Sequence, residues 1–247
     1  MGFFMQSTSH VFPLCLFIVV AACKATSESA SPSPTLVTLV PVENDGMHDR
    51  NVELAQRAKD NANARLVFLG DSITQGWESV PAIWAHEFAA YSPLNLGVSG
   101  DRTEHVLWRL EQGAYDRLRP SLFVIMIGTN NTGHRMDPPA DIAAGVQEIL
   151  AQLKRRYPMA RLALLAIFPR GEKPDDPARA NNNAVNALLV PIAKQAGAEW
   201  LDITRAFVDS NGLLSKTLMP DLLHPNSRGY EVWANAIRDP PNRWMNR

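Results

Sequence analysis

Five short apolar runs recur along the chain, and stretches with the apolar spacing of a helix separate them. The runs occupy residues 65–70, 93–97, 121–128, 161–168 and 199–203. Short runs that are mostly apolar, without a strict alternation of apolar and polar residues, are typical of strands buried on both faces of a parallel sheet. Strands that alternate with helices predict a three-layer α/β fold with a parallel sheet.

The stretches between the runs carry apolar residues on one helical face. Ile142, Val146 and Leu153 follow the spacing of such a face, for example. The same pattern predicts a final helix after Asn226 or Ser227, either of which can cap it. The predicted helices lie around residues 51–62, 84–91, 106–110, 142–153, 185–196 and 230–237.

Residues that can take part in catalysis follow the predicted strands. Ser72 follows the first strand, Gly100 the second and Asn130 the third, while Asp221 and His224 lie near the carboxyl terminus. In an open parallel sheet the binding site lies beyond the carboxyl ends of the strands. Each segment also has a structural interpretation by itself, as a turn, a helix cap or a local hydrogen bond. Their combination is far more specific.

Together these residues can perform acyl transfer. That reaction needs a nucleophile, a base that takes its proton, and an acid that orients the base. Ser72 is the candidate nucleophile, His224 the base and Asp221 the orienting carboxylate. The backbone N–H groups of Ser72 and Gly100 and the side-chain amide of Asn130 are candidate donors to the oxyanion. Gly100 suits this role because no Cβ blocks the substrate oxygen.

These blocks resemble the SGNH (GDSL) hydrolase family, whose letters stand for the Ser, Gly, Asn and His just named. Within the family, the resemblance is to the catalytic subunits of intracellular platelet-activating-factor acetylhydrolase. It rests on GDRTEHVLWRL at 100–110, GTNN at 128–131 and PRGE at 169–172, and it covers roughly residues 50–238. The Asp221 to His224 segment has the family's Asp-x-x-His arrangement.

The resemblance implies a flavodoxin-like, five-stranded sheet in the order 2-1-3-4-5. It implies hydrolysis of carboxylic esters, with short acyl or acetyl groups expected, without a metal or an organic cofactor. It also implies a homodimer. An acetylated carbohydrate or another small ester is the expected substrate, because many envelope members of the family remove acetyl groups from carbohydrates. Three alternatives remain: an acyltransferase with the same triad, a lysophospholipase or acetylhydrolase acting on lipid, and a non-catalytic carbohydrate-binding module.

The amino terminus predicts export. An apolar run at 11–23 has the length of a signal-peptide core and ends in Val20-Ala21-Ala22-Cys23, which resembles the bacterial lipobox. Residues 1–22 are therefore predicted to be a lipoprotein-type signal peptide, Cys23 the lipidation site, 23–40 a flexible tether and 41–247 the hydrolase domain. No Lys or Arg precedes the run, so a plain secretory peptide or a misplaced start remains an alternative. The expected location is the bacterial cell envelope, lipid-anchored in the periplasm, or the medium.

Composition excludes several other classes of protein. Lys and Arg total 24 and Asp and Glu total 25, giving a net charge of -1, so no basic surface for nucleic acid is indicated. The 2 cysteines exclude a disulfide-dense scaffold and a four-cysteine zinc site. After the amino-terminal run, no apolar stretch is long enough to span a membrane, so contact with a membrane is expected only through the lipid anchor.

Two further residues are candidates for the substrate pocket. His134 lies shortly after Asn130, and Trp77 lies shortly after Ser72. For Trp77, packing in the core is an equally good interpretation.

Overall fold

The computed structural model describes residues 1–4, 36–238, 241 and 243. The chain divides into two compact units, Met1–Pro34 and Thr35–Arg247, and the second holds every described helix and strand. Nearly all of the predicted signal peptide, together with Cys23, lies outside the described residues. None of the helices in the described part of the chain is both long and apolar enough to cross a membrane.

A five-stranded parallel sheet forms the centre of the second unit. Its order is β2-β1-β3-β4-β5, which confirms the predicted fold class and strand order. The strands are β1 (Leu66–Gly70), β2 (Pro93–Gly97), β3 (Leu122–Met126), β4 (Arg161–Leu165) and β5 (Glu199–Leu201). The strands β1 and β3 are buried at every position, as their unbroken apolar sequences predict.

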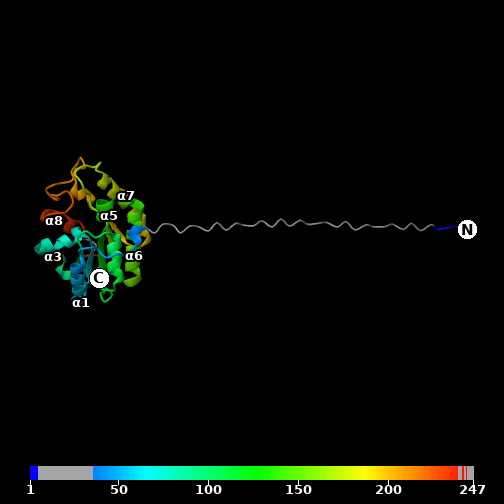
Figure 1. The fold of residues 1–247 in the computed structure, drawn as a ribbon, viewed down its shortest axis with the longest axis horizontal. Coiled ribbons are helices and arrows are strands. Elements are labelled where there is room, and N and C mark those ends of the chain that lie inside the picture. Colours follow the sequence, from blue (N-terminus) through cyan, green and yellow to red (C-terminus); the bar gives the residue numbers. More distant parts are fainter. Residues whose placement is uncertain (5–35, 239–240, 242, 244–247) are drawn as a thin grey trace. The chain divides into compact units, whose positions relative to one another are not determined.

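Helices cover both faces of the sheet, and alternate strand residues separate two cores. Val67 and Leu69 face α1, α4, α6 and α7, whereas Leu66 and Phe68 face α2, α3 and α8. Figure 1 shows α3 and α8 on the same side, where they contact each other. The helices are α1 (His48–Asp60), α2 (Ser72–Gln75), α3 (Pro81–Phe88), α4 (Thr103–Glu111), α5 (Thr129–Arg135), α6 (Pro139–Arg156), α7 (Pro177–Gln195) and α8 (Ser227–Ala236).

The strand order places a topological switch point beside β1. From β1 the chain moves to one neighbour, β2, and later returns to the other side as β3. The three strands end at Gly70, Gly97 and Met126, which are aligned in register. The segments that follow them therefore start from one edge of the sheet, which is where an open α/β fold binds its ligand.

Two helices of the described residues, the four-residue α2 and the longer α5, were not predicted. The segment Thr129–Arg135 reads as a turn in the sequence, but it forms α5. Its first four residues are buried and polar, so it has no apolar periodicity from which a helix could be inferred. Gly128 precedes it with φ 126°, a conformation that favours glycine.

The folded unit also begins before the predicted domain start at residue 41. The 3₁₀-helix η1 (Val37–Leu39) packs against α4 and α6. Thr38 is 0% exposed, and its hydroxyl donates to the carbonyl of Asp141 at 2.8 Å. The predicted tether to residue 40 is therefore too long, because hydrogen bonds of the buried Thr38 hold this segment in the folded unit.

Candidate active site

The candidate nucleophile begins a short helix at the end of a buried strand. β1 ends at Gly70, and Ser72 is the first residue of α2. Asp71 caps this helix, since its Oδ1 accepts the N–H of Ile73 at 2.9 Å. The cap leaves the Ser72 N–H without a hydrogen-bond partner among the described residues, so this group is available to a substrate oxygen.

The helix that carries Ser72 is held by close packing at glycines. A Cβ on Gly97 would collide with the backbone of Gln75, so only glycine lets β2 approach α2 this closely. A Cβ on Gly76 would collide with the hydroxyl of Tyr230. That hydroxyl donates to the carbonyl of Ile73 at 2.7 Å. The position of the nucleophile is therefore fixed from β2 on one side and from α8 on the other.

Ser72, His224 and Asp221 form one hydrogen-bonded chain. The Oγ of Ser72 lies 3.0 Å from Nε2 of His224, and Nδ1 of His224 lies 2.7 Å from Oδ2 of Asp221. The other oxygen of Asp221 accepts the N–H groups of Leu223 and His224 at 3.0 and 2.7 Å. Leu222 adopts a left-handed conformation, with φ 63°, in the turn that brings the carboxylate back to the ring.

The electrostatics of these three hydrogen-bonded residues favour transfer of the Ser72 proton to His224. Burial raises the pKa of Asp221, but hydrogen bonds from the ring and the N–H of His224 outweigh it, so the net pKa lies below its usual value. An ionised Asp221 holds the proton of His224 on Nδ1 and leaves the lone pair of Nε2 facing the serine hydroxyl. The side chains of His224 and Asp221 are 42% and 56% exposed, so this side of the site is open to solvent.

The candidate oxyanion donors come from the ends of the two neighbouring strands. Gly100 follows β2 with φ 76°, and no hydrogen bond among the described residues uses its N–H. Asn130 lies in the buried first turn of α5, and its Nδ2 donates to the carbonyl of Asp101 at 3.0 Å. An amide nitrogen carries two hydrogens, so one remains for a substrate.

A buried arginine ties the ends of β1 and β2 together. Arg109, on α4, donates from Nε to the carboxylate of Asp101 at 2.9 Å. Its two terminal nitrogens donate to the carbonyls of Leu96 and Gly70 at 2.9 and 3.3 Å. These bonds pair a buried charge and satisfy strand carbonyls at the same time. The loop that carries Gly100 is thus anchored to both strands.

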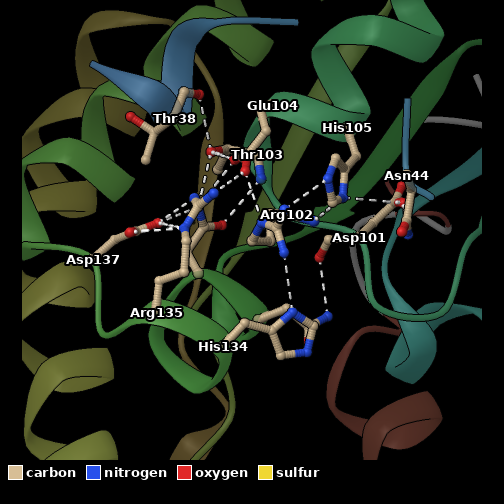
Figure 2. A network of polar contacts seen from close by, with 12 residues as sticks. Thr38, Asn44, Asp101, Arg102, Thr103, Glu104, His105, His134, Arg135 and Asp137 are labelled. Carbon is tan, nitrogen blue, oxygen red and sulfur yellow. Dashed lines mark hydrogen bonds and ion pairs between the residues drawn. The ribbon is translucent and has the colours of Figure 1, made fainter. Parts of the chain in front are cut away.

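A second polar network surrounds the start of α4 (Figure 2). The buried carboxylate of Glu104 pairs with Arg102 at 2.7 Å and with Arg135 at 2.8 Å. Arg135 also pairs with Asp137 at 2.5 Å. Burial would raise the pKa of Glu104, but the hydrogen bonds, those from the two arginines among them, hold it below its usual value. The network joins α4, which follows Gly100 in the sequence, to α5, which carries Asn130.

Of the two predicted pocket residues, His134 lies near the site. It is exposed on α5, and its Cε1 is 3.9 Å from the position that a Cβ on Gly100 would take. Its Nδ1 lies 3.2 Å from Nη1 of Arg102 (Figure 2). Partial burial, followed by the charges of Arg102 and Arg170, lowers the pKa of His134, which favours the neutral ring.

Trp77 lies elsewhere, in the core. Its side chain is 1% exposed and packs against Phe88, Tyr230 and Trp233, with ring centroids 5.4, 4.6 and 5.0 Å away. The expectation that it lines the substrate pocket is therefore corrected, and the core interpretation holds. Its ring fills part of the core cluster that also contains Ile73 of α2.

Sequence reasoning missed the residues that hold the loop after β2. Asn44 donates to the carbonyl of Ser99, and the side-chain oxygen of Gln75 accepts the N–H of Ser99. Neither residue belongs to a motif with recognisable chemistry. Gln75 follows Ser72 by one helical turn, which is the only signal that could have pointed to it.

Comparison with known proteins finds acylhydrolases among the relatives of this chain. Residues 68–232 match the model of the GDSL-like Lipase/Acylhydrolase family. The bovine (Bos taurus) platelet-activating factor acetylhydrolase IB subunit alpha1 is 36% identical over 215 residues, which cover 85% of this chain and 88% of that protein. The alpha2 subunit from Rattus norvegicus is 39% identical over 166 residues, which cover 67% of this chain and 70% of that protein.

Solved structures share the fold. A GDSL-like lipase from Bacteroides thetaiotaomicron aligns with TM-score 0.64 and 23% identity, covering 80% of this chain and 96% of that one. The acetyl xylan esterase AlAXEase aligns with TM-score 0.61 and 18% identity, covering 70% of this chain and 97% of that one. At such identities the likeness is one of architecture.

Proposed function

Because the chain belongs to the GDSL-like lipase/acylhydrolase family and is a carboxylic ester hydrolase, we propose that it removes short acyl groups, acetyl foremost, with Ser72 as the nucleophile. The observation that carries this proposal is the chain of hydrogen bonds from Ser72 through His224 to Asp221, at 3.0 and 2.7 Å. A serine in such contact with an oriented imidazole can be deprotonated as it attacks.

The reaction proceeds in two halves. The Oγ of Ser72 attacks the ester carbonyl while Nε2 of His224 takes its proton, and a tetrahedral oxyanion forms. The N–H groups of Ser72 and Gly100 and the free hydrogen of Asn130 donate to this oxyanion. The intermediate then collapses, the alcohol leaves with the proton from His224, and the acyl group stays on Ser72. Water, activated by His224, attacks the acyl-enzyme in the same way and releases the carboxylic acid.

The substrate we propose is an acetyl ester of a carbohydrate or of another small alcohol. The acetyl group is supported by the curated relatives, which are acetylhydrolases. A bulky alcohol such as a sugar is supported by the exposure of His224 and Asp221, since the side of the site from which the alcohol leaves is open. The names of the same relatives favour a second candidate, an ester of a platelet-activating-factor-like lipid. The same triad could also pass the acyl group to a sugar instead of to water.

Steady-state hydrolysis of p-nitrophenyl acetate, butyrate and octanoate tests the proposal. Wild type is expected to prefer acetate, and Ser72→Ala is expected to lose turnover while keeping its thermal melt. Ser79→Ala is the matched control, because the hydroxyl of this exposed serine donates to the nearby carbonyl of Gly76 and to no other group in the described part of the chain. A fluorophosphonate should label wild type at Ser72 alone. An active Ser72→Ala variant, or labelling at another serine, would refute the assignment.

A second assay separates the substrates. Acetylated xylo-oligosaccharides and an acetylated glycerolipid are compared by kcat/KM, with and without an added sugar acceptor. Faster release of acetate from the oligosaccharide supports the carbohydrate ester. Faster release from the lipid supports the second candidate, and acetylation of the acceptor supports transfer.

A further inference from the structure

Asn44 contacts the residues on both sides of Gly100. It lies between η1 and α1, outside the residues 68–232 that match the family. Its Nδ2 donates to the carbonyl oxygen of Ser99 at 3.0 Å and to Oδ1 of Asp101 at 2.9 Å. Figure 2 shows its amide beside the loop that ends in Asp101. Both hydrogens of this amide are therefore used on the segment that presents the N–H of Gly100.

The bond to Ser99 determines where the N–H of Gly100 points. The carbonyl of Ser99 and the N–H of Gly100 belong to the same planar peptide unit, in which they point in opposite directions. A donor that fixes the oxygen therefore fixes the N–H as well. This control matters at Gly100, because a glycine at φ 76° has more rotational freedom than any other residue. The bond also polarises the amide, which strengthens the N–H as a donor.

The preceding peptide unit, which contains the N–H of Ser99, is fixed by Gln75 of α2. Oε1 of Gln75 accepts the N–H of Ser99 at 2.8 Å and its hydroxyl at 3.0 Å. These bonds connect α2, which begins with Ser72, to the loop after β2. They act on the N–H of Ser99 and leave its carbonyl free. Within the described residues, Asn44 provides the one hydrogen bond to that carbonyl.

The second bond of Asn44 extends the same control to the side-chain donor. Asp101 is buried, with Oδ2 bound by Arg109 and Oδ1 by Asn44. The backbone carbonyl of Asp101 accepts from Nδ2 of Asn130 at 3.0 Å. The orientation of Asp101 thus sets the orientation of Asn130. One amide, Asn44, therefore helps to align two of the three donors that the proposed mechanism uses.

We propose that Asn44 is a positioning residue that aligns the Gly100 N–H and the Asn130 amide with the oxyanion of the transition state. The inference rests on the proposed function, since it assigns a purpose to the same oxyanion site. It predicts that Asn44 acts on the chemical step and hardly on substrate binding, because oxyanion bonds tighten in the transition state.

The test compares two variants with a matched control on p-nitrophenyl acetate. Asn44→Ala is expected to lower kcat about tenfold and to change KM by less than about twofold. Asn44→Asp keeps the shape but presents an acceptor to the Ser99 carbonyl, so its kcat is expected to fall at least as far. Asn51→Ala is the control, because Asn51 donates to Glu43 in the same region and does not contact Ser99. It is expected to keep wild-type kcat, and thermal melts establish that all three variants fold.

A transition-state mimic separates alignment from general structural damage. An alkylboronic acid forms a tetrahedral adduct with a catalytic serine and occupies the oxyanion site. Its inhibition constant is expected to rise about tenfold in Asn44→Ala, in step with the loss of kcat, while inhibition by acetate stays unchanged. Wild-type kcat and boronate affinity in both Asn44 variants, or a loss confined to KM, would overturn the inference. A different result would contradict the proposed function itself: a Ser72→Ala variant that still hydrolyses the ester.

Discussion

At the scale of single residues, the site depends on polar groups whose partners fix their protonation or direction. Asp221 is ionised because His224 and the local backbone donate to it. Asn130 is oriented because one of its amide hydrogens is bound to Asp101. A neutral amide held in this way can donate to an oxyanion with no change of protonation.

We expect Asn130→Ala to lower kcat by roughly 10²–10³, the usual effect of losing one oxyanion donor. KM should change little, because the missing bond forms mainly in the transition state. Steady-state kinetics on one activated ester measures both constants, and a thermal melt checks folding. A folded Asn130→Ala enzyme with nearly wild-type kcat would show that Asn130 only stabilises the turn.

Asp71 gives a prediction on pH and stability. Its carboxyl is buried, and its Oδ2 has no hydrogen-bond partner among the described residues. Burial, reinforced by the charge of Asp101, raises the pKa of Asp71 to about 7. The folded state therefore keeps a proton that the unfolded chain releases near pH 4, so the free energy of unfolding falls as pH rises from about 4 to about 7.

Asp71→Asn removes this titration while keeping the oxygen that caps α2. We expect the loss of stability between about pH 5 and about pH 8 to be smaller in this variant than in wild type, as measured by urea unfolding at both values. Equal losses in the two proteins would contradict a raised pKa at Asp71.

At the scale of elements, the position of α2 decides whether the site exists. The helix has only four residues, so it is held by its packing against β2 and by the hydrogen bond from Tyr230 of α8 rather than by its own hydrogen bonds. Gly97 and Gly76 provide the space for these contacts. The elements that carry the site are thus fixed through close backbone approach.

We expect Gly97→Ala to lower the free energy of unfolding by about 1–3 kcal/mol, the usual cost of overpacking, and to lower kcat as well. The added Cβ would meet backbone atoms of Gln75, which cannot move aside without moving α2. Gly197→Ala is the control, because open space surrounds Gly197 and only its φ of 62° is unfavourable. It should cost about 1 kcal/mol and leave kcat unchanged. Equal effects of the two substitutions on kcat would contradict the argument.

At the scale of the whole molecule, the folded unit carries the complete candidate site. Every residue assigned to the triad and the oxyanion site lies within Thr35–Arg247. The residues that precede this unit contribute none of them. We propose that they deliver the enzyme to the bacterial cell envelope, through a signal peptide cut before Cys23, which then carries the lipid.

If Cys23 carries lipid, the protein made in a bacterial host should partition into the detergent phase of a Triton X-114 extract. Cys23→Ser should move it to the aqueous phase, because the anchor is lost, and should leave kcat on p-nitrophenyl acetate unchanged. Cys15→Ser is the control and should still partition into detergent. Equal partitioning of wild type and Cys23→Ser would favour a plain secretory peptide.

The sequence by itself determined the fold class and selected the residues of the candidate site. An unbroken apolar run such as 66–70 is typical of a strand buried on both faces, and its alternation with helices favours a parallel sheet covered by helices. Ser72, Gly100, Asn130, Asp221 and His224 could be selected because they follow strands or lie in motifs. Patterns within short stretches of sequence are sufficient to infer the fold class and to select these candidate residues.

The tertiary structure alone decided which residues support the site. Asn44 and Ser99 are far apart in sequence, and their contact exists only because the segment before α1 lies against the loop after β2. The helix α5 is stabilised by buried polar contacts that have no periodic signal. Trp77 fills the core for the same kind of reason, because packing depends on neighbours that a linear pattern does not identify.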